Sequence, residues 1–217
     1  LDHTLLPLDS DYAWGVFTTD IGWTDPHGFR QRNDDFFAHY QAGTLDIHDY
    51  TRFATEAVRL RGPQQAAEAH ARFMHEVIRP VISPQAIELV RHHQDRGEQV
   101  VIVTATNEFV TRPIADAFGV QELIAVELAR DADGWITGEI SGVPSFREGK
   151  VSRVQRWLSD RGLDWDRADV TFYSDSTNDL PLLERANRPV ATNPDPRLRA
   201  VALARGWRIL DLFPAEA

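Results

Sequence analysis

From residue 99 onward, the sequence alternates between short apolar runs rich in β-branched residues and longer helix-like runs. The expected strands cover residues 99–104, 123–128, 170–174, 189–191 and 208–210, and the expected helices cover 108–118, 150–161, 179–186 and 196–204. Such alternation is typical of parallel strands, because parallel strands need long crossover connections that helices usually provide. The sequence therefore predicts an α/β fold, with a doubly wound parallel sheet and a hairpin at residues 131–138.

The N-terminal third has a different pattern, because residues 9–77 read as helical and contain many aromatic side chains. We interpret this region as an inserted helical cap, and most of its aromatic residues as the core of that cap. Ser83 and Pro84 fit the N-cap and first position of a helix that follows the return from the cap. The predicted domains are a core made of residues 1–8 and 78–217, and a cap made of residues 9–77.

Acidic residues stand where two of the apolar segments would end. Asp2 lies in the opening segment Leu-Asp-His-Thr-Leu-Leu, and Asp175 and Asp179 follow the expected strand 170–174. The carboxyl ends of parallel strands meet at one edge of the sheet, where ligands commonly bind. A hard cation such as Mg²⁺ favours oxygen ligands of this kind. Capping of a helix N-terminus explains the Asp175–Asp179 pair equally well.

A hydroxyl and a cation stand between these acidic segments in the chain. Thr104 ends an expected strand and fits phosphate binding, although a β-branched residue also suits a strand end. Lys150 follows Glu148 and Gly149, where a lone lysine is ordinarily a surface residue. Phosphoryl transfer needs groups that neutralise the charge of a phosphate monoester, align attack and protonate the leaving oxygen. The ordered set of acid, hydroxyl, cation and acid pair is more specific than any of its members.

This order resembles the haloacid dehalogenase (HAD) superfamily of phosphatases over nearly the whole chain. The first motif of that family reads Asp-x-Asp-x-Thr, and Asp2-His3-Thr4 matches its second half. The long insertion after this motif, Thr-Ala-Thr-Asn at residues 104–107 and Tyr-Ser-Asp-Ser-Thr-Asn-Asp at residues 173–179 are most similar to the phosphoserine-phosphatase-like subfamily IB.

The resemblance implies a role for each matching residue. Asp2 would be the general acid and base, and its backbone carbonyl would also bind Mg²⁺. Thr104 and Lys150 would act in catalysis, and Asp175 and Asp179 would be further metal ligands. The nucleophilic aspartate would be the residue that precedes Leu1, and we expect the natural chain to begin before Leu1, with a strand that precedes the first motif.

Substrate recognition is expected from three further residues. Asp9 falls where the subfamily carries a carboxylate for the amino group of the substrate. An ungapped alignment puts Ala54 at the position of a cap arginine, so Arg52 is the expected substitute. Asn178 is the third expected substrate contact. Because Asp9 could pair with an ammonium group, the favoured substrate is an amino-acid or amino-alcohol phosphate, such as histidinol phosphate or phosphoserine. Thr104-Ala105-Thr106 and Asp175-Ser176 depart from Ser-Gly-Gly and Asp-Gly of phosphoserine phosphatases, which argues against phosphoserine as the physiological substrate.

Composition limits the partners and the compartment. The 217 residues carry a formal charge of −10, which argues against nucleic acid and anionic membrane as partners. The sequence has no cysteine, which excludes thiolate chemistry and disulfides and suits the reducing cytoplasm. No apolar run reaches eighteen residues, so no membrane span is expected. The eight histidines lack the spacing of a metal site, and we expect a monomer or a homodimer.

Two alternative functions remain open from the sequence. The same residues would support transfer of the phosphoryl group to an alcohol acceptor, which differs only in what attacks the intermediate. A chain without the nucleophile would instead be a non-catalytic protein that binds a phosphorylated metabolite. The favoured reading is a Mg²⁺-dependent phosphatase that acts on a small phosphorylated metabolite.

Overall fold

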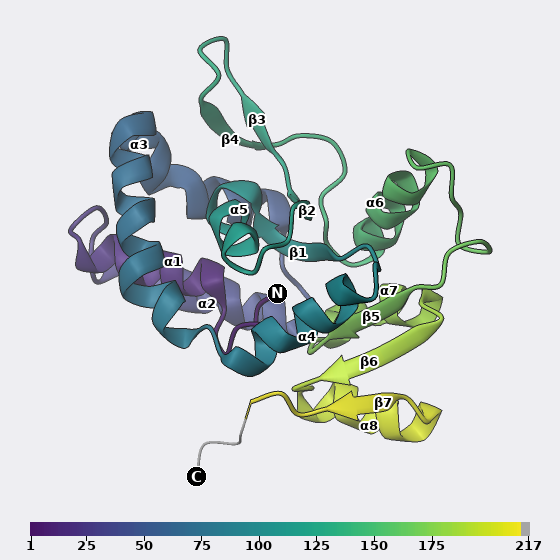
Figure 1. Cartoon of the computed structure of the whole chain (residues 1–217). Helices are drawn as coiled ribbons and strands as arrows, with labels where there is room; N and C mark the ends of the chain where they lie inside the picture. The colour runs from purple at the N-terminus through teal and green to yellow at the C-terminus, as the bar shows by residue number, and fades with distance from the viewer. Residues whose placement is uncertain (214–217) are drawn as a thin grey trace.

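The computed structural model describes residues 1–213 and has helices packed around two groups of parallel strands (Figure 1). The helices are α1 (Ser10–Asp20), α2 (Gly28–Ala42), α3 (Ile47–Phe73), α4 (Pro84–Asp95), α5 (Glu108–Ala117), α6 (Glu148–Ser159), α7 (Leu180–Arg185) and α8 (Pro196–Arg205). The strands are β1 (Val101–Asn107), β2 (Glu122–Val126), β3 (Leu128–Arg130), β4 (Ile136–Ile140), β5 (Thr171–Ser174), β6 (Arg188–Thr192) and β7 (Arg208–Leu210).

Pairing of the strands confirms the α/β fold. β1 pairs in parallel with β2, and β6 pairs in parallel with both β5 and β7. Helices connect these parallel strands, as the alternation in the sequence predicts. Within residues 1–213, no backbone ladder joins β1 to β5, so the parallel strands form two separate groups.

Burial on β1 shows that helices cover both of its faces. Ile102 packs in a large cluster that contains Ala86 and Val90 of α4 and residues of α5. Val101 and Val103, which point to the opposite face because side chains alternate along a strand, pack against Val154 and Leu158 of α6. The strand is therefore buried between two helical layers.

The opening segment lies between the carboxyl ends of β1 and β5. The carboxylate of Asp2 accepts a hydrogen bond from Thr106 of β1, and the hydroxyl of Thr4 donates to Asp175, which directly follows β5. Asn193, after β6, donates its side-chain amide to the backbone carbonyl of His3 at 2.8 Å. His3 has a φ of 50°, in the left-handed region that produces a sharp turn. These contacts fix a tight loop at the edge where the strands end.

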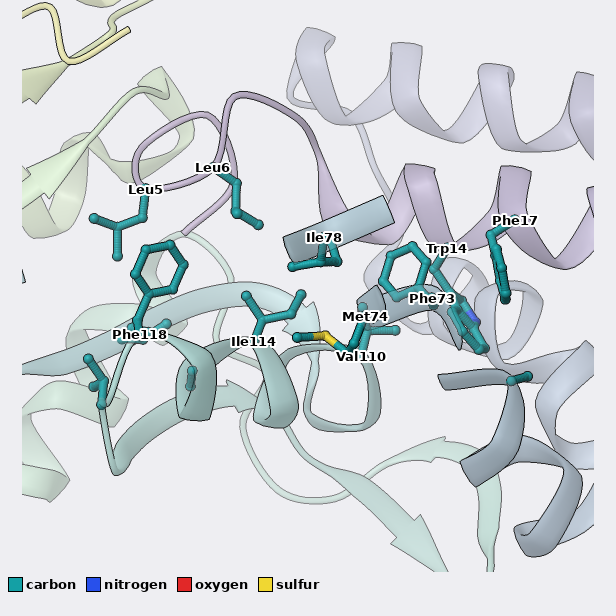
Figure 2. Packing of buried hydrophobic residues seen from close by; sticks show 14 of the residues in the cluster. Leu5, Leu6, Trp14, Phe17, Phe73, Met74, Ile78, Val110, Ile114 and Phe118 are labelled. Atoms are coloured by element: carbon teal, nitrogen blue, oxygen red, sulfur yellow. The ribbon is translucent and has the colours of Figure 1, made fainter. Parts of the chain in front are cut away.

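The helical region between residues 9 and 77 packs directly on the core. Figure 2 shows Trp14 and Phe17 of α1 in one apolar cluster with Phe73 of α3 and Ile114 of α5. The ring centroids of Trp14 and Phe73 are 5.1 Å apart in an edge-on arrangement. Replacing a buried aromatic residue of this size by alanine typically costs about 3–5 kcal/mol of stability. The aromatic residues of α1 therefore attach the helical region to the core.

The segment that leads from the helical region back to the core is not an ordinary loop. α3 is kinked at Gly62, whose φ of 76° is not helical, and Pro63 follows it. A π-helical turn (Met74–Ile78) and a 3₁₀ turn (Arg79–Val81) then lead to α4. The predicted cap on α4 is confirmed, because the Ser83 hydroxyl accepts a hydrogen bond from the backbone nitrogen of Ala86.

Several strand boundaries differ from the sequence prediction by one to three residues, and the ends of β1 and β2 show the structural reasons. β1 continues past residue 104 to Asn107, because Asn107 pairs again with Val126 of β2 beyond an irregularity in register. The strand expected at residues 123–128 ends at Val126, because Leu128 pairs with Ile140 of β4 instead of continuing the pairing of β2 with β1. The predicted hairpin is confirmed as the antiparallel pair β3–β4, which projects from the body of the molecule (Figure 1). In residues 1–213, no helix combines the length and the apolar character that crossing a bilayer requires.

Candidate active site

One cavity brings together the predicted chemical residues at the carboxyl ends of β1 and β5. Its walls include the acidic and basic residues Asp2, Asp9, Asp11, Lys150, Asp175 and Asp179, the hydroxyl residues Thr4, Thr104 and Thr106, and the side chains of Phe36, Tyr40 and Tyr50. The volume of the cavity is about 50 Å³. The ends of β1 and β5 form one part of its wall, and residues of α2 and α3 form another.

Two threonines of β1 orient the carboxylate of Asp2. Its Oδ2 accepts hydrogen bonds from the hydroxyls of Thr106, at 3.1 Å, and Thr104, at 3.4 Å. Its Oδ1 accepts one from the backbone nitrogen of Ser10 at 2.9 Å. Thr104 and Thr106 share a face because they are two residues apart on a strand. This arrangement holds a carboxylate in a defined orientation at the floor of the cavity.

Lys150 and Asp179 form a buried ion pair at the side of the cavity. The Nζ atom of Lys150 lies 2.6 Å from Oδ1 and 2.8 Å from Oδ2 of Asp179, and the side chains are both nearly inaccessible to solvent. The hydroxyl of Ser174 donates a further hydrogen bond to Oδ2 at 2.7 Å. Asp179 is therefore paired directly with Lys150, which fixes one ammonium group beside the strand ends.

The opening loop holds the carboxylate of Asp175 through a hydrogen bond. Its Oδ1 accepts a hydrogen bond from the hydroxyl of Thr4 at 3.0 Å. Burial raises the pKa of its carboxyl above the ordinary value, and the charge of Asp179 raises it further. A cation near Asp175 would relieve this concentration of negative charge.

Two more carboxylates come from the start of α1. Asp9 caps the helix, with Oδ1 accepting hydrogen bonds from the backbone nitrogens of Asp11 and Tyr12 at 3.0 and 2.8 Å. Burial, followed by the charge of Asp2, raises the pKa of Asp9 well above its ordinary value. Asp11 is 5% exposed, and burial raises the pKa of its carboxyl to about 7. The cap side of the cavity is thus acidic and poorly hydrated.

Two of the predicted substrate contacts lie outside the cavity walls. Arg52 is exposed on α3, where its guanidinium binds Asp49 and Glu139. Asn178 donates its side-chain amide to the backbone carbonyl of Tyr40 at 2.9 Å, so it links the loop after β5 to the end of α2. The structure brings together Asp2, Asp9, Thr104, Lys150, Asp175 and Asp179, but it does not bring Arg52 to them.

Sequence reasoning missed several residues of the cavity. Thr106 could have been found from the strand period, because it lies two residues after Thr104. Asp11 lacked a comparable signal, since an acidic residue in the first turn of a helix is common without any ligand. Tyr40 and Tyr50 lie among the aromatic residues of 9–77, most of which the sequence analysis interprets as cap core, and periodicity does not reveal which aromatic residues face a cavity.

Comparison with known proteins agrees with the geometry of this site. The family model described as haloacid dehalogenase-like hydrolase matches residues 1–184. The chain belongs to the haloacid dehalogenase-like hydrolase family. It is 39% identical over 212 residues to a histidinol-phosphatase of Neisseria meningitidis serogroup C (strain 8013), covering 97% of this chain and 96% of that protein. The family and this relative identify the chain as a phosphoric monoester hydrolase, as the resemblance predicts.

Solved structures of similar proteins support the haloacid dehalogenase-like fold. The crystal structure of a protein with unknown function from Bordetella pertussis Tohama I matches with a TM-score of 0.92 and 51% identity, over 98% of this chain and 96% of that one. A substrate-bound phosphoserine phosphatase matches with a TM-score of 0.66 and 17% identity, over 97% of this chain and 89% of that one. At this lower identity, the second likeness concerns the fold alone.

The oxygen atoms of this haloacid dehalogenase-like site fit a hard cation only in part. Within residues 1–213, no three acidic or histidine side chains are grouped closely enough to hold a metal ion by themselves. Mg²⁺ commonly binds one or two carboxylates and completes its coordination with substrate phosphate and water. Asp175, with a raised carboxyl pKa and a single hydrogen bond from Thr4, is the side chain that best suits this mode.

Proposed function

We propose that the chain is a Mg²⁺-dependent phosphatase that hydrolyses an amino-alcohol phosphate such as histidinol phosphate. The observation that carries the proposal is the meeting of Asp2, Lys150 and Asp175 in one cavity with the acidic start of α1. The first three residues suit chemistry on a phosphate group. The acidic start of α1 suits a leaving group that carries positive charge.

Asp2 is the proposed general acid and base. In the first step, the nucleophilic aspartate that the family motif places two positions before Asp2 would attack phosphorus, and Asp2 would give its proton to the departing alkoxide. In the second step, Asp2 removes a proton from water, which attacks the aspartyl-phosphate and releases inorganic phosphate. The hydrogen bonds from Thr104 and Thr106 support this role, because they hold the carboxylate in one orientation while it exchanges a proton.

Lys150 is proposed to bind the phosphate oxygens, and Thr104 would also do so when its hydroxyl turns from Asp2 to the substrate and leaves Thr106 to hold Asp2. Asp179 and Ser174 support Lys150 by fixing its ammonium group with short contacts. Asp175 and the backbone carbonyl of Asp2 would hold Mg²⁺, which would neutralise charge on the phosphate. Asp179 is paired with Lys150. A cavity that gathers five carboxylates and one lysine supports the need for an added cation.

Residues 9–77 are the proposed cap domain. A cavity of about 50 Å³ holds little more than one or two water molecules, which is much less than a phosphorylated metabolite needs. The cap must therefore move for a substrate to enter and for products to leave. Closure over the bound substrate would exclude water during the first transfer.

The choice of an amino-alcohol phosphate rests on the charges of the wall. Phosphoserine carries a carboxylate beside its ammonium group, and a carboxylate needs a cation or several donors when it is buried. In the described part of the cavity, Lys150 is the only basic side chain, and it is paired with Asp179. Arg52, the expected partner of a substrate carboxylate, binds Glu139 and Asp49 instead. The name of the Neisseria relative agrees with this choice.

Phosphate release by the full-length protein tests the proposed function. Histidinol phosphate, phosphoserine and p-nitrophenyl phosphate would be compared with Mg²⁺ and with a chelator. We expect kcat/KM for histidinol phosphate to exceed that for phosphoserine by at least about tenfold, which corresponds to about 1.4 kcal/mol. Preference for phosphoserine would contradict the substrate class, and formation of a phosphorylated alcohol when glycerol is added would show transfer instead of hydrolysis. A cytoplasmic location and a monomeric or homodimeric state stay predictions.

A further inference from the structure

Asp11 is a buried carboxylate that the chemistry at the phosphate does not use. It lies in the first turn of α1 and forms part of the cavity wall, with 5% of its surface exposed. Its Oδ1 is 3.4 Å from the side-chain nitrogen of Asn107, a long contact for a hydrogen bond. Within residues 1–213, no lysine, arginine or histidine forms an ion pair with Asp11. A buried carboxylate without a cation is unfavourable unless a ligand provides one.

Asp9, two residues earlier, is half-buried, and within residues 1–213 it also forms no ion pair with a basic side chain. Its Oδ1 is occupied by the two backbone donors of the helix cap, and the described residues offer no hydrogen bond to its Oδ2. The two carboxylates therefore differ in their surroundings. The charge of Asp2 raises the pKa of both carboxyls, and Asp11 in addition contacts Asn107 and lies beside Tyr50 of α3.

The wall next to Asp11 is aromatic. Phe36 of α2 and Tyr50 of α3 both line the cavity, and their ring centroids are 5.3 Å apart. Tyr50 lies beside Asp11, and interaction of its hydroxyl with that carboxyl opposes the rise in the pKa of Asp11 that burial causes. Aromatic faces attract cations and stack on flat rings, and a carboxylate at the edge of such a wall receives an N–H donor.

We propose that Asp11, Phe36 and Tyr50 form a subsite for a planar, positively charged ring on the leaving group, such as an imidazolium, while Asp9 receives an aliphatic ammonium. This inference rests on the proposed phosphatase function and deepens it. It assigns the two carboxylates to two different basic groups of one substrate. An aliphatic amino-alcohol phosphate would fill only the subsite of Asp9.

The test compares three synthetic substrates of the full-length protein. These are 3-(imidazol-4-yl)propyl phosphate, which has the ring without the amine, 3-phenylpropyl phosphate, which has an uncharged ring, and 2-aminoethyl phosphate, which has the amine alone. The wild-type protein should prefer the imidazole to the phenyl substrate in kcat/KM. In Asp11→Asn, this preference should fall by about 10- to 100-fold, the range expected for one hydrogen bond to a charged group. Hydrolysis of the phenyl and amine substrates should change little.

Two further variants make the result specific. Asp9→Asn should reduce kcat/KM for the amine substrate and leave the ratio of imidazole to phenyl nearly unchanged. Asp35→Asn is the matched control, because Asp35 is an exposed aspartate of α2 and should alter none of the three rates. If Asp11→Asn does not fold, Asp11→Glu keeps the charge but displaces it, and should lower the preference for imidazole by a smaller factor.

The outcomes separate the two proposals. Equal losses on all three substrates in Asp11→Asn, or no preference for imidazole in the wild-type protein, would overturn the subsite and leave the phosphatase intact. Absence of phosphate release from every substrate, including p-nitrophenyl phosphate, would overturn the proposed function and the subsite together.

Discussion

The ammonium group of Lys150 lies 2.6 Å from Oδ1 of Asp179, and both side chains are almost fully buried, with 4% and 6% of their surfaces exposed. The pair joins α6 to the turn before α7, across 29 positions of the chain. A buried charge of either sign is tolerated only while its partner is present. The same pair presents a fixed positive charge at an otherwise acidic cavity, so its loss should affect both stability and turnover.

Replacement of Lys150 by methionine should therefore destabilise the protein strongly. The variant leaves the carboxylate of Asp179 buried without its cation, which typically costs about 3–5 kcal/mol. Urea unfolding of the wild-type and variant proteins measures this loss directly. The double variant Lys150→Met/Asp179→Leu removes both charges and should recover much of the stability but none of the activity. A single variant as stable as the wild-type protein would show that the pair does not contribute to folding.

Asp175→Asn should weaken the response to Mg²⁺ with a small effect on the fold. The asparagine oxygen can still accept the hydrogen bond from Thr4, but the carboxylate charge that attracts the cation is lost. We expect the Mg²⁺ concentration for half-maximal activity to rise at least about tenfold. Mg²⁺ should also raise the melting temperature of the wild-type protein more than that of the variant. Asp133→Asn, at an exposed position of the β3–β4 hairpin, is the control.

The stability conferred by Asp11 should depend on pH. Burial raises the pKa of this carboxyl in the folded protein to about 7, from the ordinary 3.8. The folded state therefore holds the proton more tightly than the unfolded state, and this contribution is complete below about pH 4 and lost as the pH rises through about 7. Asp11→Asn does not titrate, so its free energy of unfolding relative to wild type should rise between pH 5 and pH 8.

The expected size of that rise is a few kcal/mol, because each pKa unit corresponds to about 1.4 kcal/mol. Urea unfolding of both proteins at pH 5 and pH 8, without metal or substrate, provides the measurement. Taking the difference between the two proteins removes the titration of Asp9 and Asp175, which both share. Asp35→Asn should show no such dependence on pH. A constant difference between Asp11→Asn and wild type would mean that Asp11 keeps an ordinary pKa.

The positions at the strand ends could be predicted because they depend on local patterns. Thr104 and Asp175 follow β-branched or aromatic runs whose ends are visible in the sequence, and parallel strands place such ends at one edge. The burial of Lys150 could also be predicted from a local pattern. Lys150, Val154 and Leu158 lie four residues apart and form the buried face of α6, so the helical period marks this lysine as inward-facing.

The cap side of the cavity depends on contacts between distant segments, which a single sequence does not reveal. Asp11 meets Asn107 across 96 positions, and Asn178 meets Tyr40 across 138. Arg52 illustrates the same limit, because its proximity to an aligned arginine position predicts a substrate contact, while its guanidinium lies on the exposed face of α3 and binds Glu139 of β4. A shift of one or two positions along a helix decides whether such a residue faces the cavity or solvent, and an ungapped alignment does not fix that register.

Asp2→Asn should separate the two proposed steps of the reaction. The variant retains an oxygen for the hydrogen bond from Ser10 and the backbone carbonyl proposed as a metal ligand, but it loses the proton donor and acceptor. With p-nitrophenyl phosphate, whose leaving group needs no protonation, the first transfer should continue while hydrolysis of the intermediate stalls. Rapid mixing should then show a burst of nitrophenol close to one equivalent, followed by turnover reduced about 10²- to 10⁴-fold. With an alkyl phosphate both steps need Asp2, so no burst should appear. Normal steady-state turnover in Asp2→Asn would exclude Asp2 as the acid and base, and a slow rate without a burst would place its contribution before the first transfer.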